Sequence, residues 1–310
     1  PMLEFAAARL ARMALTIFVI VTAVFFATRL SGDALDYVVG PGMTEEDRRL
    51  LTTYYGLDGS LGEQYLRYLA AFARGEFGLS FLERRPVADI VAERLWPSLQ
   101  LLLAAIALTL AVSLPLGVIA AVYRQSWIGS AVMAIAFAGY AVPNFVLATL
   151  MILLFSYTLN WLPVVGSGTA LHFLMPTIAL SAYLIAGLTR FTRNAMLDVL
   201  GQDYMRTARA KGLPERRVIL KHGFRNAAVT VLSVVGLQVA GLAAAGSVVV
   251  ESIFSWPGIG ELLVSAALRR DYPVLEFGVL SVAVAVIVIN ALVDLAYVLA
   301  DPRVRMADAR

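Results

Sequence analysis

The chain of 310 residues contains no cysteine, only two histidines and few charged residues. Without cysteine, neither a disulfide framework nor a thiolate metal site is possible. The histidines, His172 and His222, lie on opposite sides of an apolar segment, which excludes a compact imidazole metal site. Charged residues make up 15% of the chain and hydrophobic residues 60%, a composition that is typical of helical membrane proteins rather than of soluble domains.

Motifs for catalysis are also missing. The sequence contains no Gly-x-x-x-x-Gly-Lys-Ser/Thr loop, so the chain itself supplies no ATP site. Ser167 and Ser247 follow glycines, but neither belongs to a motif that pairs a nucleophile with a histidine on a facing helix. We therefore predict that the chain has no catalytic residues and is not an enzyme. The net charge of +3 does not indicate a nucleic-acid partner, because the basic residues gather beside apolar segments.

Long apolar runs dominate what is present. A hydrocarbon core requires about 20 mainly apolar residues per helix. Six stretches meet this requirement, at about Met13–Leu30, Ser98–Tyr123, Ile128–Leu159, Leu174–Phe191, Ala227–Phe254 and Val274–Leu299. We therefore predict an all-α membrane protein with six transmembrane helices. A cleavable signal is the alternative for the first run, but its length and the lack of a small-x-small cleavage site after it favour a span.

The distribution of Lys and Arg predicts the orientation. Residues 190–225, between the fourth and fifth runs, carry nine basic and three acidic residues, whereas residues 159–173 carry none of either. Because short cytoplasmic loops are enriched in Lys and Arg, we place residues 190–225 and both termini in the cytoplasm. Residues 31–97 then lie outside, and their seven basic residues do not contradict this, since long loops translocate largely regardless of charge. This divides the chain into residues 1–30, an external segment 31–97 and a core 98–310.

The external segment reads as helical. Thr44 precedes three acidic residues that suit a helix N-terminus. Leu61–Phe72 carries apolar residues at helical spacing, and Pro86 suits the first turn of a helix that runs to Trp96. Such a helical cap either shields the outer ends of the spans or contacts an external partner, and the sequence does not choose between the two.

A polar, strongly basic block between the fourth and fifth runs, Asp203–Asn226, is the most informative segment. Asp203–Lys211 lacks proline and glycine and predicts a helix, with Tyr204, Ala208 and Lys211 along one stripe. Gly212 suits the left-handed end of a helix, and Pro214 suits the start of the next. We expect a rigid helix pair on which a soluble partner docks closely over the small residues Ala208, Ala210 and Gly212. The alternative is an ordinary basic loop that lies on anionic lipid.

The residue order of this block resembles the EAA loop of ABC-transporter permeases, in the variant of the dipeptide, oligopeptide and nickel import family. The matching positions are Asp203, Tyr204, Arg206, Thr207, Ala208, Ala210, Lys211, Gly212 and Leu213, with His222 and Asn226 downstream. Further agreement lies in Tyr55-Gly56-Leu57-Asp58, Gln64-Tyr65, Gly78-Leu79-Ser80, Pro86-Val87, Pro143-x-Phe145, Glu251-x-x-Phe254-Ser255-Trp256-Pro257-Gly258-Ile259-Gly260, Arg270-Asp271-Tyr272-Pro273 and Asp301-Pro302-Arg303. The resemblance covers nearly the whole chain and favours the first permease of the family's pair, which carries a large external segment.

The resemblance implies a type I ABC importer in the bacterial inner membrane. Its implied partners are a second homologous permease, two cytoplasmic ATPases that hold ATP and Mg²⁺, a periplasmic or lipid-anchored binding protein, and lipid. Residues 203–213 would be the coupling helix, within a loop at about 200–226, with His222 and Asn226 supporting its return to the fifth span. The resemblance implies import of peptides or similar solutes, but it does not choose among dipeptides, oligopeptides, glutathione, nickel chelates and opine-like compounds. We also expect a side chain in Gly212→Asp to clash at the turn and uncouple the permease.

Two positions depart from the family pattern. Arg206-Thr207-Ala208 replaces Glu-Ala-Ala, as is usual in this subfamily, and Val146 replaces a Trp that often follows Pro-x-Phe. The second departure affects the packing of the third span and leaves the coupling logic intact.

Polar groups within apolar runs are candidates for the translocation path, because they are costly in lipid. They are Asn144, Gln238, Glu251, Asn290 and Asp294, to which Trp256 adds an aromatic group for an outer gate. The alternatives are interhelical hydrogen bonds for Gln238, packing or anchoring for Asn290 and Asp294, and an interfacial aromatic belt for Trp256. For the whole chain, the alternative function is a self-contained secondary transporter or channel. No inverted repeat with paired broken helices supports that reading.

Overall fold

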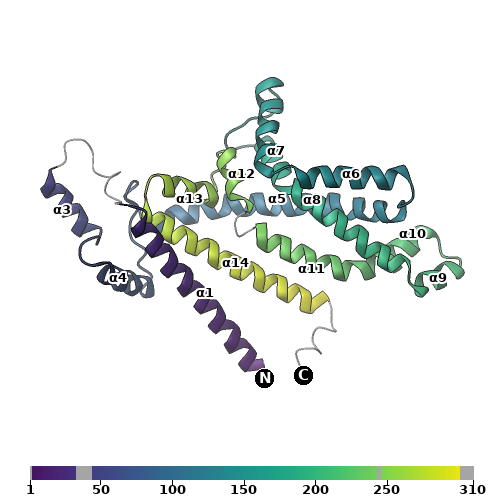
Figure 1. Ribbon diagram of the computed structural model, residues 1–310, viewed down its shortest axis with the longest axis horizontal. Coiled ribbons are helices and arrows are strands. Elements are labelled where there is room, and N and C mark those ends of the chain that lie inside the picture. The colour runs from purple at the N-terminus through teal and green to yellow at the C-terminus, as the bar shows by residue number, and fades with distance from the viewer. Residues whose placement is uncertain (1, 33–43, 243–245, 301–310) are drawn as a thin grey trace. The chain divides into compact units, whose positions relative to one another are not determined.

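The computed structural model describes residues 2–32, 44–242 and 246–300, and the ordered elements in these ranges are helices (Figure 1). Within these ranges, Leu79 and Pro86 also form an isolated antiparallel β-bridge. The helices are α1 (Met2–Leu30), α3 (Glu45–Tyr54), α4 (Leu61–Ala73), α5 (Val87–Val122), α6 (Trp127–Ala141), α7 (Asn144–Met151), η1 (Ile152–Thr158), α8 (Ala170–Leu200), α9 (Asp203–Ala210), α10 (Glu215–Arg217), η2 (Val218–Phe224), α11 (Arg225–Gly241), α12 (Val248–Ile253), α13 (Ile259–Leu268) and α14 (Tyr272–Ala300). The all-α prediction is confirmed.

In the described part of the chain, four helices are long and apolar enough to cross a membrane, and two bent pairs raise the number to six if each pair is one span. One pair joins α6 to the α7–η1 helix with a bend of 97°, and the other joins residues 215–228 to residues 230–241 with a bend of 51°. The third predicted span, expected as one run, is therefore broken. Conversely, the two elements expected around Trp96 and Ser98 form one helix, α5, of 36 residues.

The break in the third span has a local cause. α6 ends at Ala141, and Val142 takes an extended conformation with φ −88° and ψ 119° before Pro143. A proline disfavours the helical conformation of the residue before it, and it has no N–H to donate to the preceding turn. Pro143 then precedes the first residue of α7, Asn144.

Two compact units divide the described residues. The first takes residues within 1–98 and 257–285, and the second takes residues within 99–256 and 286–310. Residues 257–285, which the sequence analysis assigned to the core, thus belong with the external segment. The expected helices of that segment are present as α3 and α4, and α3 begins immediately after Thr44.

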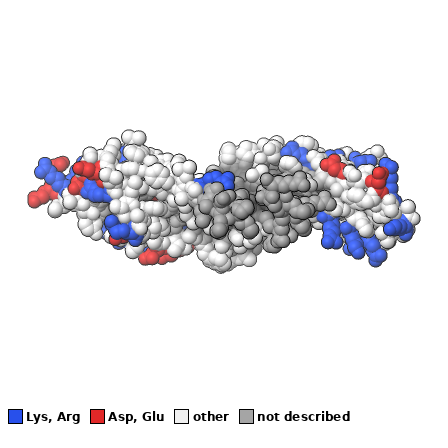
Figure 2. Space-filling model, turned by 90° about the horizontal axis from the view of Figure 1, so that it is seen from below, with Lys and Arg blue, Asp and Glu red and all other residues white. Residues whose placement is uncertain are grey.

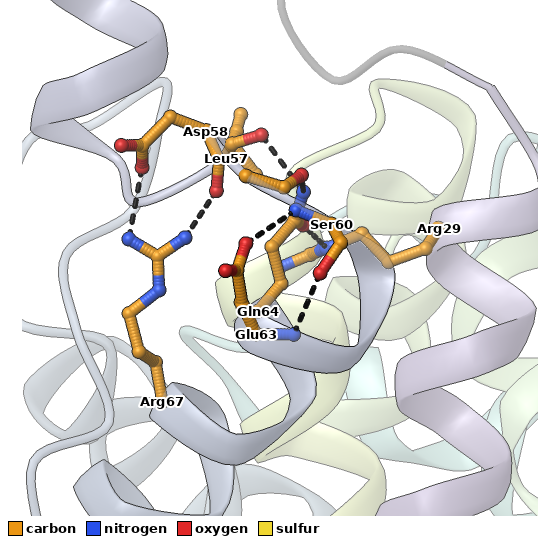
Figure 3. Close-up of polar contacts among 8 residues, drawn as sticks. Arg29, Leu57, Asp58, Ser60, Glu63, Gln64 and Arg67 are labelled. Atoms are coloured by element: carbon orange, nitrogen blue, oxygen red, sulfur yellow. Dashed lines mark hydrogen bonds and ion pairs between the residues drawn. The ribbon is translucent and has the colours of Figure 1, made fainter.

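In the first unit, a polar network ties α4 to α1, as Figure 3 shows, and α1 in turn to α14. Ser60 and Glu63 form a reciprocal capping box at the start of α4, and this contact holds the pKa of the Glu63 carboxyl below its usual value. The next residue, Gln64, donates to the carbonyl of Leu57 at 2.8 Å and accepts from Arg29 at 3.1 Å. Arg29 also pairs with the buried Glu276 at 3.3 Å.

A second anchor in this unit is the carboxylate of Asp271. It accepts hydrogen bonds from the hydroxyl of Ser80 and, at 3.0 Å, from the backbone N–H of Phe81. All three residues are buried. The anchor therefore holds the turn before α5 against the segment that precedes α14.

We expect Asp271→Ala to lower the free energy of unfolding by about 1–3 kcal/mol, because it leaves the buried N–H of Phe81 without an acceptor. The control is Glu76→Ala, which removes an exposed pair with Arg74 and should cost less than about 1 kcal/mol. Thermal unfolding of the two purified variants measures the difference. Equal stability of Asp271→Ala and Glu76→Ala would contradict the anchor.

In the second unit, α8 packs against α6, α7 and α11, as Figure 1 shows. Its largest apolar cluster includes Leu101, Met175 and Leu180, together with Phe254 and Trp256 from the segment after α12. The side chain of Trp256 is fully buried and meets Phe173 edge to face, with ring centroids 4.5 Å apart. The burial of Trp256 gives it a packing role, which neither the outer gate nor the alternative of an interfacial belt required.

Candidate functional site

The basic block folds as a helix, a turn and a second helix. α9 runs from Asp203 to Ala210, Gly212 has φ +72°, and α10 begins immediately after Pro214. This left-handed conformation costs glycine little, because glycine has no Cβ. The predicted helix-break-helix pattern is confirmed.

A small core makes the block rigid. Met205 and Ala208 of α9 are buried together with Val218 of η2, and Leu213 packs against them. Ala208 is buried, whereas Tyr204, one turn earlier on α9, is exposed, so the predicted close docking over Ala208 is wrong. Ala208 supports the block from within, and a partner cannot approach over it.

An ion pair closes the turn between the two helices. The guanidinium of Arg209 contacts the carboxylate of Glu215, with the shortest distance 2.9 Å. The hydrogen bond from Arg209 holds the pKa of the Glu215 carboxyl below its usual value. The pair therefore stabilises the block above the unfolded-state pKa of a glutamate, and its contribution is lost as the pH falls through the lower, folded-state pKa. Both groups are largely exposed, so the contribution is small.

The outward face of the block is polar and basic. Figure 2 shows Lys and Arg gathered over the end of the second unit where α9 and α10 lie. The exposed predicted coupling residues are Asp203, Tyr204, Arg206, Thr207, Ala210, Lys211 and Gly212. Further along the chain, the amide of Asn226 donates to the carbonyl of His222 at 2.7 Å, so these two residues join η2 to the start of α11. The block thus offers a charged, preformed surface to a soluble partner.

A cavity of about 570 Å³ lies beside the broken third span in the second unit. Asn144, at the start of α7, and Gln238, on α11, both line it. Two of the predicted path residues therefore share one space. Gly187 of α8 makes room for Gln238, since a Cβ at this glycine would lie 3.1 Å from the amide nitrogen of Gln238.

The other predicted path residues lie elsewhere. Glu251 and Trp256 are fully buried, so neither side chain lines an open path in this conformation. Asn290 is exposed on α14, and the side chain of Asp294 lies outside the described part of the structure. Within the described residues, the structure thus brings together Asn144 and Gln238 but neither Glu251 nor Trp256 with them.

Sequence reasoning missed two tyrosines on the wall of the same cavity. Tyr140 and Tyr183 stack with ring centroids 4.7 Å apart, and their hydroxyls lie 3.1 Å from each other. The guanidinium of Arg190 lies 5.1 Å from the centre of the Tyr140 ring. A tyrosine within an apolar run resembles any core aromatic, so only the proximity of Tyr140 to Pro143 could have drawn attention to it.

Comparisons with known proteins extend this picture. The pattern of the family described as "Binding-protein-dependent transport system inner membrane component" matches residues 113–306. The glutathione transport system permease proteins GsiC of Escherichia coli K12 and of Shigella dysenteriae serotype 1 are each 41% identical to the chain over 305 residues, which covers 98% of this chain and 99% of each relative.

Two solved structures share the fold. Both are inward-facing conformations of the MetNI methionine ABC transporter, with TM-scores of 0.58 and 0.59. The matches cover 70% of this chain and 98% of the solved chain, at 16% and 15% identity. At this identity the likeness concerns the fold alone.

Proposed function

Because the chain belongs to the family of binding-protein-dependent transport system inner membrane components, and is thus a membrane-spanning permease subunit of an ABC importer, we propose that its basic block, residues 203–226, receives a cytoplasmic ATPase. The observation that carries this proposal is the ordered helix-turn-helix, whose small core packs against Val199 and Leu200 of α8 and whose outer face is charged and exposed. A preformed helical block transmits the movement of a bound partner to the membrane helices, whereas a flexible loop would not.

The proposed complex contains this chain, a second homologous permease, two ATPase subunits with ATP and Mg²⁺, and a periplasmic or lipid-anchored binding protein. It lies in the bacterial inner membrane with both termini of this chain in the cytoplasm. The concentration of Lys and Arg in the short segment 190–225 supports this orientation. Nucleotide-driven closure of the ATPases would move the block and alternate the access of the path.

We place part of the translocation path at the cavity that Asn144 and Gln238 line. Its position at the break of the third span supports this, because discontinuous helices expose backbone polar groups where solutes bind in other transporters. Peptides or similar small solutes are the proposed cargo, and glutathione is the first to test because relatives at 41% identity are named as its permeases.

Co-purification tests the proposal. The chain is isolated from its native membrane with its partners, and the accompanying proteins are identified by mass spectrometry, in the wild type and in a variant with residues 203–213 replaced by a flexible linker. We expect a sister permease, ATPases and a binding protein with the wild type, and loss of the ATPases alone in the variant. Undiminished ATPase recovery with the variant would refute docking on the block, and transport by the chain alone would favour a self-contained carrier.

A further inference from the structure

We propose that the hydroxyls of Tyr140 and Tyr183, together with the amides of Asn144 and Gln238, form a contact site for acceptor oxygens of the passing solute. The inference rests on the proposed role of the cavity as part of the path. It goes beyond that role, because it gives the permease a selective contact of its own and names the solute groups, carbonyl and carboxylate oxygens, that the contact takes.

The first observation is unused hydrogen-bonding capacity. Among the described residues, neither the Asn144 nor the Gln238 side chain has a hydrogen-bond partner. The two tyrosine hydroxyls share one hydrogen bond, so one of their two O–H hydrogens remains available. Amide and phenol groups within a membrane span are costly unless something satisfies them. Three available donor groups therefore line one open hollow, where water or a polar solute can satisfy them.

The second observation is the depth of the cavity in the membrane, which separates its polar groups from the bulk solution. α6 has 15 residues and is about 22 Å long, which is shorter than the roughly 30 Å of a hydrocarbon core. With residues 127–158 as one span, the break that follows α6 therefore falls within the hydrocarbon core. The last carbonyls of α6 receive no hydrogen bond from a following helical turn, because the chain leaves the helical conformation at Val142. Irregular backbone at this depth is tolerated where it lines a water-filled or ligand-filled space.

The charge around the cavity indicates which solute groups fit. None of the described residues that line it is Asp, Glu, Lys, Arg or His. A cation there would find no counter-charge, whereas amide and phenol donors suit carbonyl and carboxylate oxygens. Arg190, behind the ring of Tyr140, adds positive potential to that side of the wall. The site therefore favours solutes rich in acceptor oxygens over cationic ones.

The absence of native cysteine makes a clean test possible. Ala141→Cys places a reporter on the cavity wall, and Ile135→Cys places one on the same helix, 71% exposed but outside the cavity lining. The assembled transporter is treated with a hydrophilic methanethiosulfonate reagent, and modification of this chain is measured by mass. We expect the Ala141→Cys reporter to react roughly tenfold faster or more, because a thiol surrounded by lipid forms little thiolate.

Solute contact is then measured as protection of the Ala141→Cys reporter. S-methylglutathione, which has no free thiol and is rich in acceptor oxygens, should slow the labelling, and the dicationic peptide lysyl-lysine should not. Adding Tyr140→Phe together with Tyr183→Phe keeps both stacked rings and removes both hydroxyls, so we expect the protection constant to weaken about three- to tenfold. Tyr157→Phe is the matched control, because Tyr157 is exposed at the end of η1 and should change nothing.

The outcomes test the contact site, the tyrosine pair and the path separately. Fast labelling without protection by S-methylglutathione, or equal protection by both peptides, would overturn the contact site and leave a merely water-filled path. Protection that the Tyr140→Phe, Tyr183→Phe double variant leaves intact would remove the tyrosine pair from the site. Equal, slow labelling of both reporters would overturn the cavity as a path, while recovery of the ATPases from the same membranes reports on the proposed coupling separately.

Discussion

Replacing Gly212 with valine is expected to lower ATP-dependent solute uptake by roughly tenfold or more while the chain remains in the membrane. Gly212 holds the turn between α9 and α10 at φ +72°. A left-handed conformation costs an L-residue about 1–2 kcal/mol, and a penalty of about 1.4 kcal/mol lowers the equilibrium ratio of the native turn to other turn conformations tenfold. Nothing lies within 4 Å of a Cβ at this position, so the clash that the sequence suggested for Gly212→Asp is absent and the penalty comes from the backbone.

A series of substitutions separates these two causes. If backbone strain decides, uptake falls in the order glycine, asparagine, alanine, valine at position 212, because asparagine tolerates the left-handed region despite its larger side chain. The control is Gly201→Ala. Gly201 has φ −80°, and the nearest atoms to its added Cβ lie at 3.8 Å, so this variant should transport normally. Loss of uptake in order of side-chain size, with asparagine worse than alanine, would contradict the strain argument.

Trp256→Ala is expected to lower the free energy of unfolding by about 3–5 kcal/mol, because it empties a fully buried site in the largest apolar cluster of the second unit. Trp256→Phe keeps the edge-to-face contact with Phe173 and should lose much less. The matched control is Trp127→Ala, since Trp127 is 79% exposed and its removal leaves no cavity.

Thermal unfolding in detergent, combined with uptake per folded molecule, distinguishes packing from gating at Trp256. The packing role predicts a large loss of stability and normal uptake by the fraction that remains folded. A stable Trp256→Ala variant with altered uptake would instead restore the outer gate that the sequence suggested.

The sequence predicted the helices well where composition and local chemistry decide them. Apolar runs of span length located the membrane helices, Thr44 located the start of α3, and Gly212 with Pro214 located the turn of the basic block. The size of the bend at Pro143 was not predicted, because a proline within an apolar run is compatible with a tilt, a kink or a full break. In the structure the extended conformation of Val142 makes it a full break, and α8 packs against α6 and α7 on either side.

The sequence did not predict which side chains are buried or which motifs contact each other over long distances in the chain. Gly78-Leu79-Ser80 and Arg270-Asp271-Tyr272-Pro273 were separate motifs in the sequence, and the structure joins them through Ser80 and Asp271. Ala208 looked like a surface residue because small side chains permit close approach, yet it faces a core inside the block. In both cases the deciding contacts come from residues distant from the motif itself.

Cross-linking from the basic block tests the central claim most directly. Tyr204→Cys places a thiol on the exposed face of α9, Ala208→Cys places one inside the block, and Leu66→Cys places one on the exposed face of α4 in the external segment. Each variant is coupled in its native membrane to a maleimide that carries a photoreactive group, and the products are identified by mass spectrometry. The account predicts an ABC ATPase joined to the Tyr204→Cys variant and to neither of the others. An ATPase joined equally to the Leu66→Cys variant, or none joined to a fully labelled Tyr204→Cys variant, would contradict it.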